Sequence, residues 1–578
     1  MQRLLACVTF GLIVVSTQCL AQDKMLCEIR DIEPEEIKVA GFRLNSPQDV
    51  KVEAIGFRES RRSEWRFTRA WILNAGTRDV VWDMEDADSE RKGKYLVEFT
   101  DSVALPRGDY EVFYSSFVGN YHKYRRGTGN FFGWLLDKIF DEDDYEDVYD
   151  AYRRELKQFR IAVRGRGEAF GENVEELNKT FNQTAFVQMT SLRDDEYERQ
   201  GFELEKPLNV QVYAIGEARR DGTFDYGWIM DAESRETLWK FDYRDSEPAG
   251  GAKKNRRVRD VISLPAGRYV AFFVTDDSHS YGGWNADPPY DPMYWGLTLR
   301  VEAPDVLKYV RRYVPDETSK QNVILEFTRL RDNEFRTGGF TLKRDLDLRI
   351  YALGEGRRHE MFDYGWIIDA RTHQLVWKMD YANTEHAGGG EKNRLFNGVV
   401  HFKKGSYIVY YVTDDSHSYW DWNTAPPFDK EHWGITIMAA DKTFNPGDVA
   451  EYNPRDEGKI LAQIVRVQNY DRERERFTLR KDSEVRIYAI GEGQDGSMYD
   501  YGWIENAATH DVVWEMTYRK TKHAGGARKN RLFDGTILLK KGEYIVYYET
   551  DDSHSFEDWN AAPPYDPVHW GITLYLVE

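Results

Sequence analysis

Hydrophobic and polar residues alternate in short runs along most of the chain, and this pattern predicts β-strands. Residues 485–490 read Val-Arg-Ile-Tyr-Ala-Ile, and residues 210–215 and 348–353 follow the same pattern. A period of two places successive side chains on opposite faces, as in a half-buried strand. Further β-forming runs are separated by polar turn residues. About six to eight such strands in roughly 120 residues predict an antiparallel β-sandwich or jelly roll.

The pattern recurs four times along the chain. Tyr-Gly-Trp-Ile occurs at 226–229, 364–367 and 501–504, and Thr-Asp-Asp-Ser-His-Ser occurs at 275–280, 413–418 and 550–555. Both motifs recur after 138 and then 137 residues. A divergent first copy keeps the spacing from Trp71 to Trp82 that the second copy shows from Trp228 to Trp239. Repetition at a fixed period indicates tandem units of one fold.

We therefore expect an all-β protein of four tandem antiparallel β-sandwich domains, the first with a helical insertion. Repeat 1 contains apolar residues at helical spacing from Phe132 to Phe140, followed by an acidic run, which predicts a helical insert at about 131–157. The expected divisions are a signal peptide at 1–21, repeat 1 at 22–165, a linker at 166–183, repeat 2 at 184–303, a linker at 304–321, repeat 3 at 322–440, a linker at 441–458 and repeat 4 at 459–578.

The first 21 residues have the pattern of a signal peptide. Arg3 precedes an apolar run from Leu4 to Val15, and Ala21 offers a small residue for cleavage. No later stretch reaches about 18 consecutive apolar residues, so we expect no transmembrane helix. The protein is expected to be secreted or periplasmic.

Composition excludes several classes of protein. The 578 residues carry a formal net charge of −20, which becomes −21 if Arg3 is removed with the signal peptide. A charge of this sign argues against nucleic acid as a partner. Three cysteines in so long a chain exclude a disulfide scaffold and a CxxC-type metal module.

Four polar groups recur at matching positions of repeats 2 to 4, and their chemistry suits Ca²⁺. They are a Glu after a strand-ending glycine, an Asp before Tyr-Gly-Trp, an Asp pair, and an Asn after a Trp. Ca²⁺ takes six to eight oxygen ligands from carboxylates, amides and carbonyls. The candidate ligands are Glu217, Asp225, Asp276, Asp277, Asn285, Glu355, Asp363, Asp414, Asp415, Asn423, Glu492, Asp500, Asp551, Asp552 and Asn560.

Two alternatives to a cation site remain open. Asp residues at a strand end can cap turns by accepting bonds from backbone N–H groups. A Lys-Asn-Arg motif also recurs, at 254–256, 392–394 and 529–531, and could neutralise the carboxylates from within. Repeat 1 lacks the set: Phe57 follows Gly56, and we align Ser115 and Ser116 with the Asp pair.

The Trp-Asn-x-x-Pro-Pro loops suggest carbohydrate binding as a second hypothesis. A Trp beside polar groups can stack on a sugar ring while its neighbours bond the hydroxyls. Each loop Trp is paired with the recurring His of its repeat, which gives the candidate ligand-binding residues Trp284, His279, Trp422, His417, Trp559 and His554. The alternative is that the Trp covers the end of the sandwich and the His orients the loop.

We expect no enzymatic activity. Asp277, Ser278 and His279 are adjacent, but neighbouring residues of an extended chain point to opposite faces. Ser278 would therefore face away from an imidazole that Asp277 orients, which excludes a serine triad of the usual geometry. Other catalytic motifs, such as G-x-S-x-G and HExxH, are absent from the sequence.

The order of these features resembles the bacterial pre-peptidase C-terminal type of β-sandwich. The residues that carry the resemblance are Phe477-Thr-Leu, Val485-Arg-Ile-Tyr-Ala, the Gly-Trp-Ile hairpin and Leu539-Lys-Lys-Gly-Glu-Tyr-Ile-Val-Tyr. The resemblance implies an accessory module of an exported protein, and calcium at loop carboxylates. We therefore expect an exported, non-enzymatic protein with a binding or scaffold role, whose partner is an extracellular or envelope protein or a glycan. The alternative is a multivalent carbohydrate- or envelope-binding protein.

Overall fold

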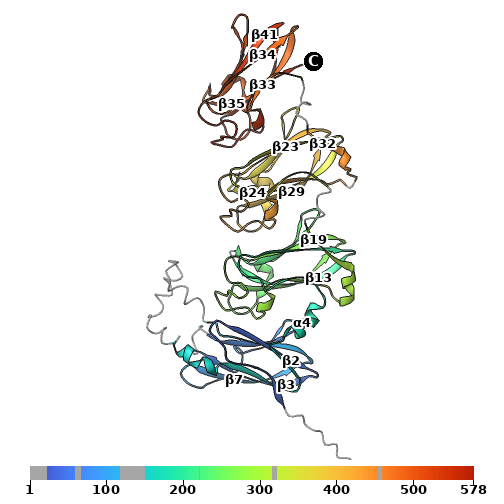
Figure 1. The fold of residues 1–578 in the computed structure, drawn as a ribbon, viewed down its shortest axis with the longest axis vertical. Coiled ribbons are helices and arrows are strands. Elements are labelled where there is room, and N and C mark those ends of the chain that lie inside the picture. Colours follow the sequence, from blue (N-terminus) through green and yellow to red (C-terminus); the bar gives the residue numbers. More distant parts are fainter. Residues whose placement is uncertain are drawn as a thin grey trace, which may run out of the picture. The chain divides into compact units, whose positions relative to one another are not determined.

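The computed structural model describes residues 23–58, 67–117, 150–220, 222–315, 322–441, 443–452 and 459–577. The expected signal peptide lies outside these residues. The chain forms two compact units, Met1–Pro315 with repeats 1 and 2, and Asp316–Glu578 with repeats 3 and 4. Each repeat contains two antiparallel sheets, which confirms the predicted all-β fold of tandem sandwiches; Figure 1 colours the repeats in chain order.

Repeat 1 is built from two five-stranded sheets. The first has the order β1 (Lys24–Ile29), β9 (Arg160–Gly165), β3 (Gln48–Phe57), β7 (Leu96–Leu105) and β6 (Ser89–Arg91). The second has the order β10 (Glu168–Gly171), β2 (Ile37–Leu44), β8 (Gly108–Ser115), β4 (Arg69–Asn74) and β5 (Val80–Asp83). Residues 150–155 are helical and lead into the 3₁₀ turn η1 (Leu156–Gln158); the rest of the predicted insert lies outside the described residues.

Repeat 2 follows the same plan. Its first sheet has the order β11 (Ala185–Thr190), β20 (Gly296–Arg300), β13 (Leu208–Arg219), β18 (Asn255–Leu264) and β17 (Glu247–Pro248), with β14 (Gly222–Thr223) paired to β13. Its second has the order β16 (Thr237–Lys240), β15 (Tyr226–Asp231), β19 (Gly267–Val274), β12 (Tyr197–Leu204) and β21 (Val310–Tyr313). The 3₁₀ turns are η2 (Tyr243–Asp245), η3 (Pro292–Tyr294) and η4 (Pro304–Tyr309).

Repeat 3 matches repeat 2 strand for strand. Its first sheet has the order β22 (Val323–Phe327), β31 (Gly434–Ala439), β24 (Leu346–Arg357), β29 (Asn393–Phe402) and β28 (Glu385–His386), with β25 (Glu360–Met361) paired to β24. Its second has the order β27 (Leu375–Lys378), β26 (Tyr364–Asp369), β30 (Gly405–Val412), β23 (Phe335–Leu342) and β32 (Val449–Glu451). The 3₁₀ turns are η5 (Tyr381–Asn383), η6 (Lys430–His432) and η7 (Pro446–Asp448).

Repeat 4 keeps the first sheet and has four strands in the second. The first has the order β33 (Ile460–Val465), β42 (Gly571–Leu576), β35 (Ser483–Gln494), β40 (Asn530–Leu539) and β39 (Lys522–His523), with β36 (Ser497–Met498) paired to β35. The second has the order β34 (Arg472–Leu479), β41 (Gly542–Glu549), β37 (Tyr501–Asn506) and β38 (Val512–Glu515). The 3₁₀ turns are η9 (Tyr518–Lys520) and η10 (Pro567–His569).

The predicted strand 485–490 shows how the alternation forms the core. Val485 and Ile487 are fully buried, while Arg486 between them is half-buried and pairs with Asp534 on β40. The inward side chains of the two sheets interdigitate, as in other sandwiches. Trp570, immediately before β42, is fully buried in the same core.

The polar segments predicted as linkers contain regular structure. Segment 166–183 holds β10 and the helix α4 (Glu175–Asn182), and the next two linkers hold β21 and β32. Each of these strands pairs with the edge of the repeat that precedes it: β10 with β2, β21 with β12 and β32 with β23. The sequence did not predict these strands because an edge strand exposes much of its surface and can therefore have a polar composition.

Candidate functional site

The recurring polar residues of repeats 2 to 4 come together at one end of each sandwich. In repeat 2, Glu217 lies near the end of β13, Asp225 immediately precedes β15, and Asp276 follows β19. The aspartate before Tyr-Gly-Trp is the centre of the cluster. It is fully buried in all three repeats, as Asp225, Asp363 and Asp500.

Both oxygens of this aspartate accept hydrogen bonds. In repeat 2, Oδ1 of Asp225 accepts from the backbone N–H of Asp276 at 2.9 Å, and Oδ2 accepts from Nε1 of Trp295 at 2.9 Å. The same pair of bonds recurs at Asp363, with 2.8 and 3.0 Å, and at Asp500, with 2.9 and 3.2 Å. The carboxylate therefore ties the Asp-Asp loop to the first residue after η3 and its equivalents.

A lysine lies against the recurring glutamate. Lys254 donates to Glu217 at 2.8 Å and also to the amide oxygen of Asn285 at 2.7 Å. The Lys–Glu distance is 2.9 Å for Lys392–Glu355 and 3.1 Å for Lys529–Glu492. The internal neutraliser that the Lys-Asn-Arg motif suggested is thus in contact with a predicted cation ligand in every one of the three repeats.

Fewer cationic side chains contact the clustered carboxylates in repeats 3 and 4 than in repeat 2. Ligand oxygens of Glu355, Asp363 and Asp414 lie within 4.8 Å of one another, and so do those of Glu492, Asp500 and Asp551. Each group of three carboxylates contacts one lysine. Oε2 of both glutamates is buried without a hydrogen-bond partner, whereas Glu217 of repeat 2 has Arg219 Nη2 at 3.8 Å as a second cation.

Burial raises the pKa of these carboxyl groups. The pKa of Asp500 rises to about 8, chiefly because the group loses its hydration and partly because Asp551 and Glu492 are close. Burial also raises the pKa of Glu355 and Asp414, against the lowering effect of hydrogen bonds. A buried carboxylate group of this kind favours a proton or a bound cation.

The second aspartate of each pair lies outside the cluster. Asp277, Asp415 and Asp552 are exposed. Asp276 instead turns back and accepts from the N–H of Ser278 at 3.0 Å, as an Asx turn does. The recurring Asn423 and Asn560 are exposed, and Asn560 accepts from Lys529 at 2.6 Å.

The recurring histidine holds two loops together. His279 Nε2 lies 2.5 Å from Asn255 Oδ1, and Asn255 donates through Nδ2 to the carbonyls of Gly250 and Asp287. Because the amide nitrogen is used as a donor, Oδ1 is the acceptor and the imidazole carries its proton on Nε2. His417 and His554 make the same contact, and all three have a left-handed backbone with φ near +60°.

The loop tryptophans pack inward. Trp284 is half-buried, and its ring centroid lies 5.1 Å from that of His279 and 4.9 Å from that of Trp295, both edge to face. Trp422 and Trp559 repeat this arrangement at 5.0 and 5.1 Å from their histidines. Each tryptophan covers the end of a sandwich, and the predicted ligand-binding pair of His and Trp makes its contacts within the protein.

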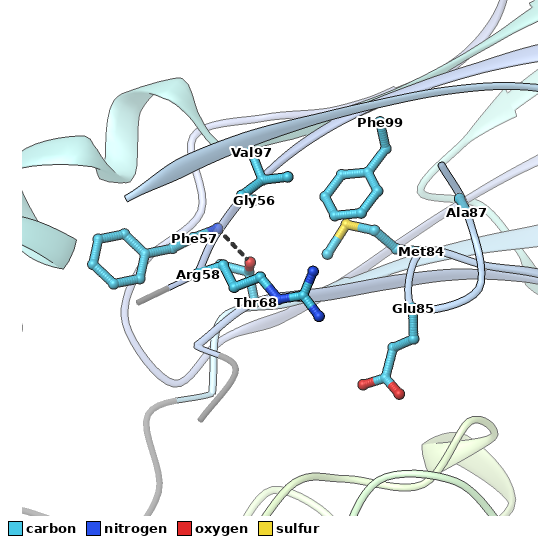
Figure 2. Close-up of a pocket in the computed structure, with 9 residues that line it drawn as sticks. All are labelled: Gly56, Phe57, Arg58, Thr68, Met84, Glu85, Ala87, Val97 and Phe99. Carbon is cyan, nitrogen blue, oxygen red and sulfur yellow. Dashed lines mark hydrogen bonds between the residues drawn. The ribbon is translucent and has the colours of Figure 1, made fainter. Parts of the chain in front are cut away.

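The corresponding corner of repeat 1 lacks the glutamate and the central aspartate. Phe57 and Thr68 stand where the other repeats have the Glu and the central Asp, and the N–H of Phe57 donates to Thr68 Oγ1 at 2.8 Å. Figure 2 shows this bond beside Met84 and Phe99 in a small pocket. The strand register also corrects the alignment of Ser115 and Ser116, because Ser115 pairs as Val274 does; Phe117 therefore occupies the position of Asp276.

A second site joins repeats 3 and 4. The Pro-Pro segment that follows the Trp-Asn loop continues into Tyr565 and Asp566, which contact repeat 3. Trp366 Nε1 donates to the carbonyl of Tyr565 at 2.7 Å, and the hydroxyl of Tyr410 donates to Asp566 at 2.9 Å. Nδ1 of His373, in the turn between β26 and β27, lies 2.8 Å from the same carboxylate.

Repeats 1 and 2 are joined in the same way. Trp71 Nε1 donates to the carbonyl of Tyr290 at 2.6 Å, and the guanidinium of Arg78 contacts Asp291 at 2.5 Å and Glu111 at 2.6 Å. All three charged groups are at most 1 % exposed. Helix α4 completes the junction by packing Leu177 with Ala75 and Phe181 with Tyr213.

Sequence reasoning missed these junctions. A signal was available, since an aromatic residue and an Asp follow Pro-Pro in all three later repeats, as Tyr290-Asp291, Phe428-Asp429 and Tyr565-Asp566. The glycan-binding hypothesis gave a role to the tryptophan of each loop but none to the aromatic residue and the Asp that follow Pro-Pro. Their partners, Arg78 and His373, belong to the preceding repeat and differ from each other, so comparison of one repeat with the next does not reveal them.

Comparison with known proteins adds little. No protein-family model and no curated protein matches the chain. Among solved structures, a chain of the X-ray structure of the entire lipid-containing bacteriophage PM2 matches at 11% sequence identity, over 68% of this chain and 99% of that chain, with a TM-score of 0.12. A match at this TM-score carries no argument. Among the described residues, no helix is long and apolar enough to cross a membrane.

Proposed function

We propose that this chain is an exported, non-catalytic scaffold whose β-sandwich repeats are locked together in pairs. The observation that carries the proposal is the shared junction: in each unit, the Pro-Pro loop of one repeat is bound by a Trp indole and a buried cationic or imidazole side chain of the preceding repeat. Buried polar groups that are fully paired rigidify an interface. The recurring histidines support the absence of catalysis, because they bond asparagines rather than serines.

The proposal predicts that repeats 3 and 4 unfold as one cooperative unit. Phe335 of repeat 3 lies with its ring centroid 6.2 Å from that of Phe556 of repeat 4, and Arg472 is the residue of repeat 4 at the same register as Phe335. Because repeat 4 has an arginine at this register, Phe335→Arg should leave repeat 3 folded. The substitution places a charge in the junction with repeat 4.

Scanning calorimetry of the full chain tests this coupling. The wild type should show one transition for repeats 3 and 4, and Phe335→Arg should split it in two. Val399→Arg is the control, because Val399 is 50 % exposed on β29 of the same repeat. Separate transitions in the wild type would refute the locked pair.

A structural cation in repeats 3 and 4 is a second part of the proposal. Its support is the buried, unbonded Oε2 of Glu355 and Glu492 beside two further carboxylates. Thermal unfolding in EDTA and then in millimolar Ca²⁺ tests it, since a ligand at a hundredfold excess over its Kd stabilises the folded state by about 2.7 kcal/mol. Hydrogen exchange should show the stabilisation in repeats 3 and 4 rather than in repeat 2, and Asp414→Asn should remove the contribution of the site in repeat 3 while that of repeat 4 remains. Equal hydrogen-exchange rates with and without Ca²⁺ would refute the cation site and indicate that the carboxylates cap turns.

The loop tryptophans Trp284, Trp422 and Trp559 pack inward, each in an edge-to-face contact with the recurring histidine of its repeat. Because these rings are already in contact with the protein, their packing favours a scaffold role over glycan binding through these residues.

A further inference from the structure

The junction of repeats 3 and 4 gathers two imidazoles and a carboxylate that are distant in the sequence. His373 comes from the β26–β27 turn of repeat 3, and Asp566 and His569 come from the loop and η10 of repeat 4. The three side chains are 6, 2 and 6 % exposed, and their ligand atoms all lie within 4.8 Å of one another. This cluster is separate from the carboxylate cluster at Asp500.

Both imidazoles are directed at the same carboxylate. Both imidazoles turn Nδ1 toward Asp566, at 2.8 Å from Oδ2 for His373 and 2.9 Å from Oδ1 for His569. His569 Nδ1 shares a hydrogen bond with Asp566 Oδ1, whereas His373 Nδ1 and Asp566 Oδ2, which are both buried, form an ion-pair contact that is not aligned as a hydrogen bond. The three ligand atoms are close enough together to hold one metal ion if it replaces the protons that the two Nδ1 atoms carry toward the carboxylate.

Surrounding groups hold the ligands in place. The His373 ring stacks on Tyr488 with 4.2 Å between centroids, and its Nε2 lies 3.3 Å from the Tyr575 hydroxyl. The Tyr410 hydroxyl donates to Asp566 at 2.9 Å. Hydrogen bonds of this kind, to the outer atoms of ligands, fix the tautomer and the ring orientation in metal sites.

The sister junction shows that the buried aspartate requires a cation. There Arg78 occupies the position of His373, and Tyr294 occupies that of His569. The guanidinium neutralises Asp291 directly. Repeats 3 and 4 have replaced the arginine by imidazole and the tyrosine by a second imidazole, so the permanent charge is gone and two nitrogen ligands have been gained.

We propose that His373, Asp566 and His569 bind a Zn²⁺ ion that cross-links repeats 3 and 4. Two imidazole nitrogens and a carboxylate oxygen suit Zn²⁺, which is commonly four-coordinate, and the fourth position is left to a water molecule. Because the ligands come from both repeats, the ion stabilises the junction and not either repeat alone. Its binding is independent of Ca²⁺ at the carboxylate clusters.

The test uses the full chain, stripped with EDTA, dialysed and titrated with Zn²⁺. Calorimetry and elemental analysis after gel filtration should give one tightly bound Zn²⁺ per chain, and Co²⁺ in its place should give the visible absorption of a tetrahedral site. The variant His373→Arg/His569→Tyr installs the residues of the sister junction. It should fold and lose the bound ion.

Two further variants keep the outcome decisive. His569→Gln should also lose the ion, if the double variant does not fold. His523→Gln, at an exposed histidine that bonds the carbonyl of Ala527, should keep it. A wild type that retains no more Zn²⁺ than the double variant, or a loss of Zn²⁺ in His523→Gln alone, would overturn the proposal and leave the two imidazoles as ion-pair and hydrogen-bond partners of Asp566.

Discussion

The buried histidine of repeat 4, His554, should make the stability of that repeat depend on pH. Burial, reinforced by the ammonium group of Lys529, lowers the pKa of His554 from 6.5 to about 3. The imidazole is therefore neutral in the folded repeat and becomes charged after unfolding in mild acid. Between pH 3 and 6.5 the unfolded state binds more protons, so stability falls as the pH falls.

The magnitude follows from these two pKa values. Between pH 7 and pH 5 the difference in proton binding destabilises repeat 4 by about 2 kcal/mol through His554 alone. Carboxyl groups act in the opposite direction: the raised pKa of Asp500, about 8, means that the folded state takes up a proton as the pH falls, and this stabilises it. The pH profile of the wild type therefore mixes the two effects, and a variant is needed to separate them.

His554→Gln isolates the histidine. Its amide can still donate to Asn530 Oδ1, as Nε2 of His554 does, but it does not titrate. Hydrogen exchange of the full chain, read on peptides of β35 and β40, should show that acidification from pH 7 to pH 5 destabilises the wild type by about 2 kcal/mol more than the variant. Peptides of repeat 2, which retains His279 and belongs to the other unit, serve as the internal control. An equal response to pH in both proteins would refute the argument that burial keeps His554 neutral.

Three substitutions test other features, each by thermal or urea unfolding of the full chain. Arg78→Ala should destabilise unit Met1–Pro315 by about 3–5 kcal/mol, because Asp291 and Glu111 would remain buried without their cation; a change below about 1 kcal/mol would contradict this, since that is the scale of an exposed ion pair. Asp500→Asn should cost about 1–3 kcal/mol at about pH 9, above the raised pKa of Asp500, because one of the two N–H donors to the carboxylate would then face an amide NH₂; an unchanged midpoint at that pH would contradict the role of the carboxylate as a double acceptor. Gly526→Ala should cost about 1 kcal/mol or more, since φ is +62° and the added Cβ would lie 1.9 Å from the carbonyl oxygen of Pro563; a neutral outcome would mean that this turn adjusts.

The sequence predicted the fold more completely than the site. The alternation at Val485–Ile490 and the tryptophan spacing correctly indicated paired sheets, because both reflect local burial that each repeat satisfies by itself. The carboxylate cluster was predicted as a group since its members recur together. Sequence alone did not show that Asp277 faces solvent while Asp276 faces inward, because the turn that separates them depends on the N–H of Ser278.

The junctions were beyond this reasoning for a physical reason. Arg78 and His373 differ in charge, size and hydrogen-bonding pattern, yet both serve a buried aspartate of the following repeat. Comparison of repeats finds residues that are the same, whereas an interface requires residues that are complementary. The sequence did not predict linker strands such as β32 for a similar reason: their stability comes from the sheet edge with which they pair and not from their own composition.

The pairing of β32 with β23 has a consequence for dividing the chain. A cut at the predicted boundary after residue 440 would remove Val449–Glu451 and leave the edge of Phe335–Leu342 open to pairing with other molecules. An isolated repeat 3 trimmed in this way should aggregate. Repeat 4 shows how an edge is protected otherwise: β34, at the edge of its sheet, reads Arg-Glu-Arg-Glu-Arg, and this run of alternating charge discourages a neighbouring strand from adding to it.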